Sequence, residues 1–230
     1  IVSKPDITSG LEASIYADTI RSILLYLGVS DVKIEEGSMR CDTNVSLKEE
    51  NSSVLGTKVE IKNIGSISNV NKSIDYEIKR QTKLLEEGNT IHEETRRYDD
   101  TLGQTVLMRS KETGNDYRYF PEPDIPYVIL TEEEIEETRK NIPVLPNELK
   151  IKYTNAGMSE IAMKALLANY ELCRFLEENY ESLSPVIAAN LLTGDILSYL
   201  NREKMTLAQT KLTKESFQDL VTVLEKKEIS

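Results

Sequence analysis

The chain has 230 residues, 39% of them hydrophobic, which is enough for one large or two modest domains with a buried core. Its net charge of -11 counts against non-specific binding to nucleic acid, which usually relies on clustered lysine and arginine. Two cysteines far apart, with no long apolar run and no leader pattern, argue against a disulfide framework, a zinc site, a membrane protein and a secreted protein. We therefore expect a soluble protein of the cytoplasm.

The first expected element is a helix. Ser9 with Glu12 forms a capping box at its start, and Gly28 is placed to end it. Its apolar stripe consists of Leu11, Ile15, Ile23, Leu24 and Leu27.

Two strands with the same design follow. In SMRCDTNVSL, residues 38–47, apolar or small residues alternate with polar ones, so one face suits a core and the other is polar. After Gly56 the pattern recurs, with Val59 and Ile61 facing one way. The polar side chains of the two strands are Arg40, Asp42, Asn44, Ser46, Lys48, Lys58, Glu60 and Lys62.

A second helix and further strands complete this part. From residue 68 to 87 the positions Val70, Ile74, Ile78 and Leu85 recur at helical spacing, and Gly88 ends the helix. The pieces TRRYDD, QTVLMRSKE and DYRYF each resemble a strand and carry Arg96, Arg109 and Arg118, respectively. We predict an α+β fold whose sheet is mostly antiparallel, with flanking helices.

The composition changes after Pro121. The stretch PEPDIPYVIL cannot extend a strand or helix far, because each proline removes a hydrogen-bond donor. Thr131 with Glu134 forms another capping box, Ser184 with Pro185 suits a helix start, and TKESFQDLVTVLEKK is amphipathic. We predict a first domain at residues 1–130 and an all-α domain at residues 131–230.

The polar side of the two strands could bind a nucleotide. Its lysines and arginine can donate hydrogen bonds to phosphate oxygens, and its carboxylates are ligands that Mg²⁺ favours. The alternative is an ordinary solvated face, because antiparallel sheets with one face in water alternate in the same way.

Other catalytic arrangements have less support. His92 is the only histidine, and HEETRR supplies no nucleophile beside it, so a surface histidine is the simpler interpretation. Neither a P-loop nor a GxGxxG motif occurs. Cys41 falls on the apolar side of its strand and is expected to be a buried structural thiol.

A series of longer motifs points to a family. The strings IVSKPDI, GSMRCDTNVSL, GTKVEIKNI, EETRRYDDT, TVLMRSKE and DYRYFPEPDIP occur in this order, followed by VLPNELKIKY and ANLLTGDILSYLN. Along essentially the whole chain, the sequence resembles the B subunits of bacterial aspartyl/glutamyl-tRNA amidotransferases.

The resemblance implies a fold and an activity. The first domain would be part of a glutamine synthetase-like catalytic domain. With ATP and Mg²⁺, the complex would phosphorylate the side-chain carboxylate of Glu-tRNA(Gln) or Asp-tRNA(Asn), and ammonia from glutamine would displace the phosphate. An amidase (A) subunit, a small C subunit and the misacylated tRNA would be its partners. The alternatives are a non-catalytic tRNA-binding or scaffold fragment and a ligase that acts on a free amino acid.

Site residues follow from the polar strands and the resemblance together. Glu60, between two lysines, is the candidate Mg²⁺ ligand. Arg40, Asp42 and Lys62 are the candidate catalytic residues. The candidate ATP- or substrate-binding residues are Asn44, Lys58, Asn63, Arg109 and Arg118, and the residues suggested for the tRNA are Lys150, Lys152, Lys211 and Lys214.

The chain departs from the family pattern in two respects. Where the family often has KNLNS, this sequence has KNIGS, so Gly65 replaces an asparagine. The sequence also begins at Ile1 without an initiator methionine, and relative to the family it lacks the first part of the catalytic domain and a C-terminal tail domain. We therefore expect a central fragment, from which some metal ligands and tRNA contacts are missing.

Overall fold

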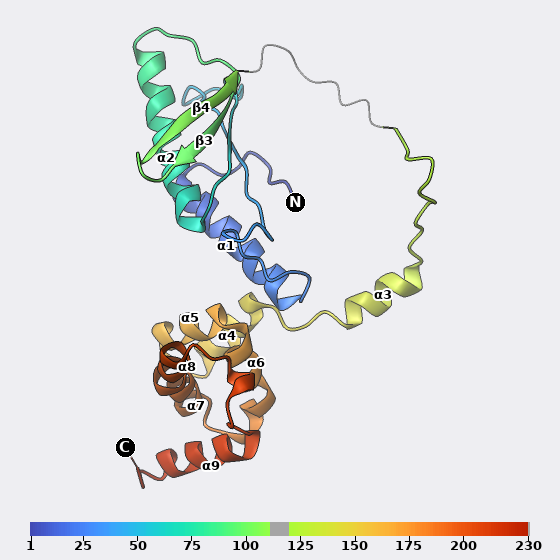
Figure 1. Ribbon diagram of the computed structural model, residues 1–230, viewed down its shortest axis with the longest axis vertical. Coiled ribbons are helices and arrows are strands. Elements are labelled where there is room, and N and C mark those ends of the chain that lie inside the picture. The colour runs from blue at the N-terminus through green and yellow to red at the C-terminus, as the bar shows by residue number, and fades with distance from the viewer. Residues whose placement is uncertain (111–119, 230) are drawn as a thin grey trace. The chain divides into compact units, whose positions relative to one another are not determined.

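The computed structural model describes residues 1–110 and 120–229. They form two compact units, Ile1–Asn141 and Ile142–Ser230, each of which is described by itself (Figure 1). The predicted boundary at residues 130 and 131 differs from this division by one helix, α3 (Glu132–Lys140), which has no buried residue. No helix within the described ranges is both long and apolar enough to cross a membrane.

The first unit combines a four-stranded sheet with two long helices. Its helices α1 and α2 pack on each other, and α2 also contacts β1 and β4. The sheet order is β1-β2-β3-β4. The elements in chain order are α1 (Gly10–Tyr26), β1 (Thr43–Val45), β2 (Val59–Lys62), α2 (Ile67–Glu86), β3 (Glu94–Asp99) and β4 (Gln104–Ser110).

The sheet is mixed. The prediction of a mostly antiparallel sheet is therefore wrong for the central pair of strands. The outer pairs, β1 with β2 and β3 with β4, are antiparallel, but the central pair, β2 with β3, is parallel. The reason is the connection: α2 lies between β2 and β3 in the sequence, and a helical crossover returns the chain in the same direction. The first strand is also shorter than the ten-residue pattern suggested, because only Thr43–Val45 pairs with β2.

Helix α1 forms where predicted, but the predicted apolar stripe is not its buried face. Leu11 and Ile15 are exposed, whereas the buried residues are Gly10, Ala13, Ser14, Ala17 and Tyr26. Small residues allow α1 to approach α2 closely: a Cβ added at Gly10 would lie only 2.4 Å from the carbonyl oxygen of Asn71. Ser9 caps the helix as predicted, while the Glu12 carboxylate accepts from the Thr8 N–H instead of closing the box on Ser9.

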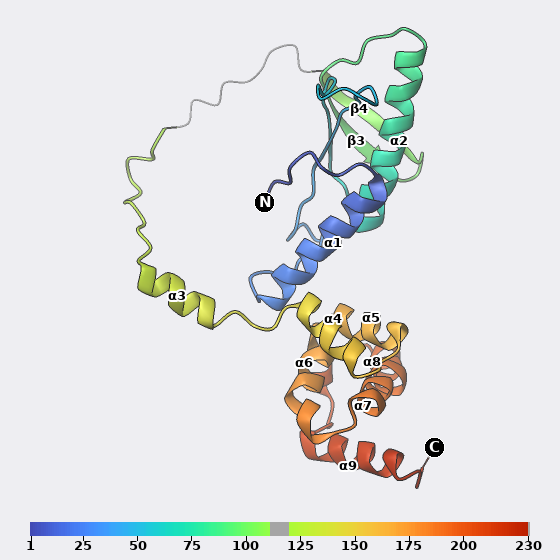
Figure 2. The ribbon, with the colours of Figure 1, turned by 180° about the vertical axis from the view of Figure 1, so that it is seen from behind.

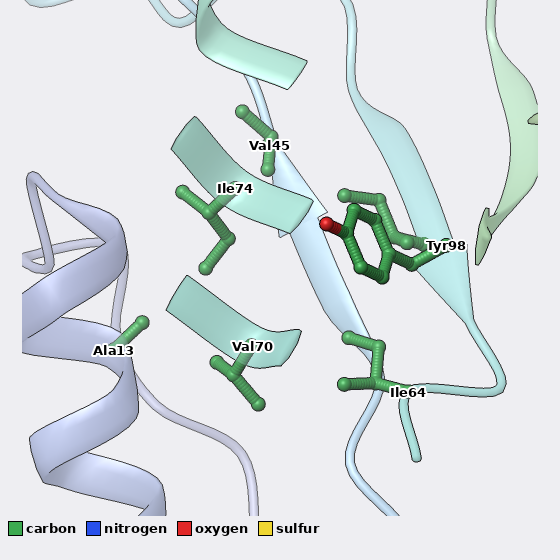
Figure 3. Packing of buried hydrophobic residues seen from close by; sticks show 7 residues of the cluster. Ala13, Val45, Ile64, Val70, Ile74 and Tyr98 are labelled. Atoms are coloured by element: carbon green, nitrogen blue, oxygen red, sulfur yellow. The ribbon is translucent and has the colours of Figure 1, made fainter. Parts of the chain in front are cut away.

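The hydrophobic core of the first unit lies between the helices and the sheet. Figure 3 shows Ala13 of α1 and Val70 and Ile74 of α2 beside Val45 and Tyr98 of the sheet. Helix α2 starts after its cap Ser66, one residue before the predicted start, and its Val70 and Ile74 are buried as expected. Leu85, near its end, is exposed.

A charged network joins α2 to β3 and β4 beside this core. Glu77 of α2 is fully buried, and its carboxylate accepts from the Arg80 guanidinium, with a shortest distance of 2.6 Å, and from the Thr105 hydroxyl at 2.9 Å. Arg96 of β3 donates to Thr105 at 2.9 Å and to Glu94 at 2.7 Å. Buried carboxylates require such partners, because an uncompensated charge in the interior is costly.

The segment after β4 contains no regular structure among its described residues until α3. The predicted strand DYRYF lies largely in residues 111–119, outside the described residues. From Pro121 to Leu130 the chain has neither helix nor ladder, as its prolines predicted. Both hydrogen bonds of the predicted capping box are present at the start of α3: the Thr131 side chain accepts from the Glu134 N–H, and the Glu134 side chain accepts from the Thr131 N–H.

The second unit is helical, as predicted, and Figure 2 shows α4 to α8 packed together. Pro185 begins α7 as predicted, although the Ser184 side chain makes no capping hydrogen bond, and Phe217 and Val221 of α9 are buried. Its elements are α4 (Pro146–Asn155), α5 (Glu160–Ala168), α6 (Tyr170–Asn179), η1 (Tyr180–Ser182), α7 (Pro185–Leu191), η2 (Leu192–Ile196), α8 (Leu197–Glu203), η3 (Leu207–Gln209) and α9 (Lys214–Glu225).

Candidate functional site

The polar side chains of the sheet gather on one face across three strands. Asn44 of β1 pairs with Glu60 of β2, and Glu60 pairs in turn with Thr95 of β3. Lys62 pairs with Arg97 one step further along. Because directly paired residues project to the same side of a sheet, these five residues share one face, which we call the polar face.

A lysine between two carboxylates forms the centre of the polar face. The Lys62 ammonium lies 3.2 Å from Asp42 Oδ2 and 3.3 Å from Glu60 Oε1. The hydrogen bond with Asp42, followed by that with Glu60, raises the pKa of Lys62 above its usual value. Glu60 is the least exposed of the three side chains, at 18%, against 35% for Lys62 and 45% for Asp42. The two carboxylates therefore converge on one position that already holds a positive charge.

The structure brings together some of the predicted site residues and leaves others at the margin. Asn44, Glu60 and Lys62 lie on paired strands, Asp42 joins them through Lys62, and Arg109 of β4 pairs with Thr95. Arg40 and Lys58 are exposed residues just before β1 and β2, so strand pairing does not fix their positions. Arg118 lies outside the described residues.

Asn63 directly follows β2 and has an unusual backbone conformation. Its φ is 57°, in the left-handed region that asparagine tolerates better than most residues other than glycine. The chain turns away from the sheet here, and α2 begins a few residues later. The structure thus gives Asn63 a conformational role, while its predicted contact with a substrate stays a prediction.

Two residues of the polar face were missed by the sequence predictions. Thr95 is 2% exposed, and its hydroxyl donates to Glu60 Oε2 at 3.2 Å. Arg97 forms an ion pair with Asp99 at 3.1 Å. The signal was present in TRRYD, where Thr95, Arg97 and Asp99 alternate with Arg96 and Tyr98. The prediction singled out Arg96 instead, which belongs to the buried network with Glu77.

The donor set of the polar face can be compared with the needs of Mg²⁺. The described residues contain no group of three or more histidine, cysteine, aspartate or glutamate side chains arranged around a metal position. Mg²⁺ commonly binds through one or two carboxylates and completes its shell with water and substrate phosphates. Asp42 and Glu60 could supply those one or two carboxylates, because both already lie close to one cation, the ammonium group of Lys62.

The remaining predicted side chains have ordinary surroundings. Cys41 is partly buried against the core of the first unit, and burial, with a smaller effect of Asp42, raises the pKa of its thiol. His92 is exposed, as predicted.

The lysines suggested for tRNA binding differ in their surroundings. In the second unit, the ammonium of Lys152 forms an ion pair with Glu177 at 2.8 Å and lies 3.6 Å from the centre of the Tyr180 ring. Lys150, Lys211 and Lys214 are exposed. Their contact with tRNA stays a prediction.

Comparisons with a family model and with individual known proteins indicate the same family. Residues 1–136 match the family model described as the GatB/GatE catalytic domain. The chain is similar to proteins named as the B subunit of aspartyl/glutamyl-tRNA(Asn/Gln) amidotransferase, with 42% identity to that of Ligilactobacillus salivarius over all of this chain and 49% of the relative. For Staphylococcus haemolyticus the identity is 45% over 98% of this chain and 48% of the relative, and for Lactococcus lactis subsp. cremoris it is 40% over 100% and 49%. The chain thus spans about half the length of the curated relatives it matches.

Proposed function

The chain belongs to the GatB/GatE catalytic domain family, and from this premise we propose that it is part of an ATP-dependent, tRNA-dependent amidotransferase. The proposed reaction converts Glu-tRNA(Gln) to Gln-tRNA(Gln), or Asp-tRNA(Asn) to Asn-tRNA(Asn), in the cytoplasm. The proposed partners are an amidase (A) subunit that supplies ammonia, a small C subunit and the misacylated tRNA. The observation that carries the proposal is the match to amidotransferase B subunits along the whole chain.

The proposed chemistry has two steps. An oxygen of the substrate carboxylate attacks the γ-phosphorus of ATP, which forms an acyl phosphate and releases ADP. Ammonia then attacks the acyl carbon, the phosphate leaves, and the amide remains after loss of a proton. Both steps concentrate negative charge on phosphate oxygens, so the protein must supply positive groups and position the reactants.

Asp42 and Glu60 are the proposed ligands of Mg²⁺. Their carboxylates converge on the position of the Lys62 ammonium, at 3.2 and 3.3 Å, which is the charge pattern that a cation requires. When bound there, Mg²⁺ would supply charge neutralisation for the transferred phosphate. Lys62 would then exchange its carboxylate partners for phosphate oxygens, while Glu60 keeps its hydrogen bond from Thr95.

The other residues predicted for the site would bind the nucleotide and the substrate. Arg109 pairs with Thr95, whose other neighbour in the sheet is Glu60, and a guanidinium can donate two parallel hydrogen bonds to a phosphate. Asn44 pairs with Glu60 and would orient the substrate through its amide. We propose similar binding roles for Arg40, Lys58, Asn63 and Arg118, and a glutamine synthetase-like origin for the catalytic fold.

The test compares Glu60→Gln with wild type in the intact protein, assembled with the proposed A and C subunits. The assay measures Gln-tRNA and Asn-tRNA formation from ATP, Mg²⁺, glutamine and the misacylated tRNA, with glutaminase activity and tRNA binding measured separately. Glu49→Gln, at an exposed loop position away from β2, is the matched control.

We expect Glu60→Gln to abolish transamidation while glutaminase activity and tRNA binding persist, and Glu49→Gln to behave as wild type. Unchanged transamidation in Glu60→Gln would remove Glu60 from the site. A wild-type assembly that binds tRNA but neither binds Mg·ATP nor forms amide would favour the scaffold alternative.

A further inference from the structure

Glu60 is held from two sides by residues of different strands. Its Oε1 faces the Lys62 ammonium at 3.3 Å, from the same strand, β2. Its Oε2 accepts from the Thr95 hydroxyl at 3.2 Å, from the neighbouring strand, β3. The lysine is a long, flexible side chain with a second partner in Asp42, whereas the threonine is short and buried. Thr95 is therefore more rigid than Lys62 as a contact of the carboxylate.

The rigidity of Thr95 has a source on the opposite side of β3. Its neighbours Glu94 and Arg96 point to α2, where Arg96 binds Glu94 at 2.7 Å and the Thr105 hydroxyl at 2.9 Å, and Arg80 approaches Glu94 at 3.5 Å. Alternation along a strand then directs the Thr95 side chain to the polar face. The charged network between α2 and β3 thereby fixes the position from which the Thr95 hydroxyl reaches Glu60.

The Thr95 hydroxyl is also shielded from competing partners. A β-branched side chain has restricted rotation about its first torsion, so the direction of the hydroxyl is largely determined by the backbone. Because only 2% of the residue is exposed, water has little access to it. A hydrogen bond in such surroundings is stronger than the same bond in water.

We propose that Thr95 is a positioning residue for the site built on Glu60. Its hydroxyl fixes the orientation of the carboxylate, so that the opposite oxygen faces Lys62 and the proposed cation position. This inference rests on the proposed function, because it concerns the binding of Mg·ATP by the same carboxylate. It adds to the site a neutral residue that the sequence predictions did not single out.

The test uses the intact protein, assembled with the proposed A and C subunits, in the variants Thr95→Val, Thr95→Ser and Glu60→Gln. Valine keeps the shape and branching of threonine but lacks the hydroxyl, while serine keeps the hydroxyl. Thr43→Val is the matched control, because Thr43 lies in the same sheet and its buried hydroxyl has no hydrogen-bond partner among the described residues. The readouts are the dissociation constant of Mg·ATP by calorimetry, kcat and KM for transamidation, and the thermal unfolding temperature.

We expect Thr95→Val to weaken Mg·ATP binding about 10-fold or more, a typical effect of removing the hydrogen-bond partner of a metal ligand. Thr95→Ser should recover most of that affinity, and Thr43→Val should match wild type. Unfolding temperatures within a few degrees of wild type would separate positioning from loss of fold.

The outcomes distinguish this inference from the proposed function. If Glu60→Gln loses activity while Thr95→Val binds Mg·ATP as wild type does, the positioning role is wrong and the proposed function stands. Equal losses in Thr95→Val and Thr95→Ser would exclude the hydroxyl as the cause and also overturn the inference. Wild-type binding and transamidation in Glu60→Gln would overturn this inference and the metal-ligand role of Glu60, while the amidotransferase function would stand. That function would fall if the wild-type assembly neither bound Mg·ATP nor formed amide.

Discussion

The buried carboxylate of Glu77 provides a prediction with a large expected effect. Its side chain is fully buried and accepts hydrogen bonds from Arg80 at 2.6 Å, from Gln81 at 3.0 Å and from Thr105 at 2.9 Å. In Glu77→Gln one acceptor oxygen becomes an NH₂ group that faces these donors. The negative charge that compensates Arg80 and Arg96 is also lost.

The magnitude follows from the burial of the partners. Arg80 and Arg96 have side chains that are only 17% and 12% exposed, so neither guanidinium can replace the lost carboxylate fully with water. Removing one member of a buried ion pair typically costs about 3–5 kcal/mol of unfolding free energy. Since a whole domain is stable by only about 5–15 kcal/mol, the first unit should lose a large share of its stability.

The assay is urea unfolding at 25 °C, combined with hydrogen exchange to separate the two units. Amides of α2 and β3 should lose protection in Glu77→Gln, and those of α4 to α6 should not. Lys72→Gln is the control: it breaks the exposed Lys72–Asp100 pair, with a separation of 3.6 Å, for which the expected cost is about 0–1 kcal/mol. A loss in Glu77→Gln no larger than that in Lys72→Gln would refute the reasoning.

Three further predictions concern backbone packing and one buried phenol. Gly10→Ala should lower the unfolding free energy by about 1–3 kcal/mol in urea, because the new Cβ would lie 2.4 Å from the Asn71 carbonyl oxygen. Asn63→Val should lower it by about 1–2 kcal/mol, because a β-branched residue is strained at a φ of 57°. Burial, followed by the contacts with Cys173 and Glu177, raises the pKa of Tyr153 in the folded protein. The unfolded chain therefore loses the phenol proton first, so the stability that this group contributes is complete below pH ~10 and is lost as the pH rises further. Wild type should therefore be more stable than Tyr153→Phe at pH 8, by about 1 kcal/mol for the lost hydrogen bond, and this advantage should shrink by pH 11.

Each of these predictions has a control and a contradicting result. Gly65→Ala places a Cβ with no neighbour within 4 Å, so a Gly10→Ala variant as stable as Gly65→Ala would mean that α1 does not approach α2 so closely. Asn63→Gly should be tolerated, and equal stability of the Val and Gly variants would argue against the left-handed conformation. A stability difference between wild type and Tyr153→Phe that stays constant from pH 8 to pH 11 would contradict the raised pKa.

The features predicted best from the sequence are those that depend on residues close together in the chain. The starts of α1 and α3 followed from Ser9 and Thr131, because a capping side chain bonds to backbone only three residues away. Glu60 and Lys62 of the polar face, and Asp42 beside it, were anticipated because alternation along a strand is equally local. What these charged residues do with a substrate is still a prediction.

Features that depend on distant partners were predicted less well. The parallel pairing of β2 with β3 depends on where the α2 crossover returns the chain, which alternation does not encode. The outward position of Leu11 and Ile15 arises because the small residues of α1 pack on α2, a choice that hydrophobicity alone would not make. Thr95 was missed because its importance comes from its pairing with Glu60, far away in the sequence.

The mixed topology also has a consequence for the order of folding. The β1–β2 and β3–β4 pairs each join neighbouring segments and can form as separate hairpins, whereas the central parallel pair requires α2 to be in place between them. Contacts between distant segments form late, because a longer loop must close first. Glu60 and Thr95 belong to different hairpins, so we expect their hydrogen bond to appear only when the hairpins dock, after each has acquired exchange protection in a pulse-labelling experiment. A partly folded chain would then contain every charged residue of the polar face and still lack the site.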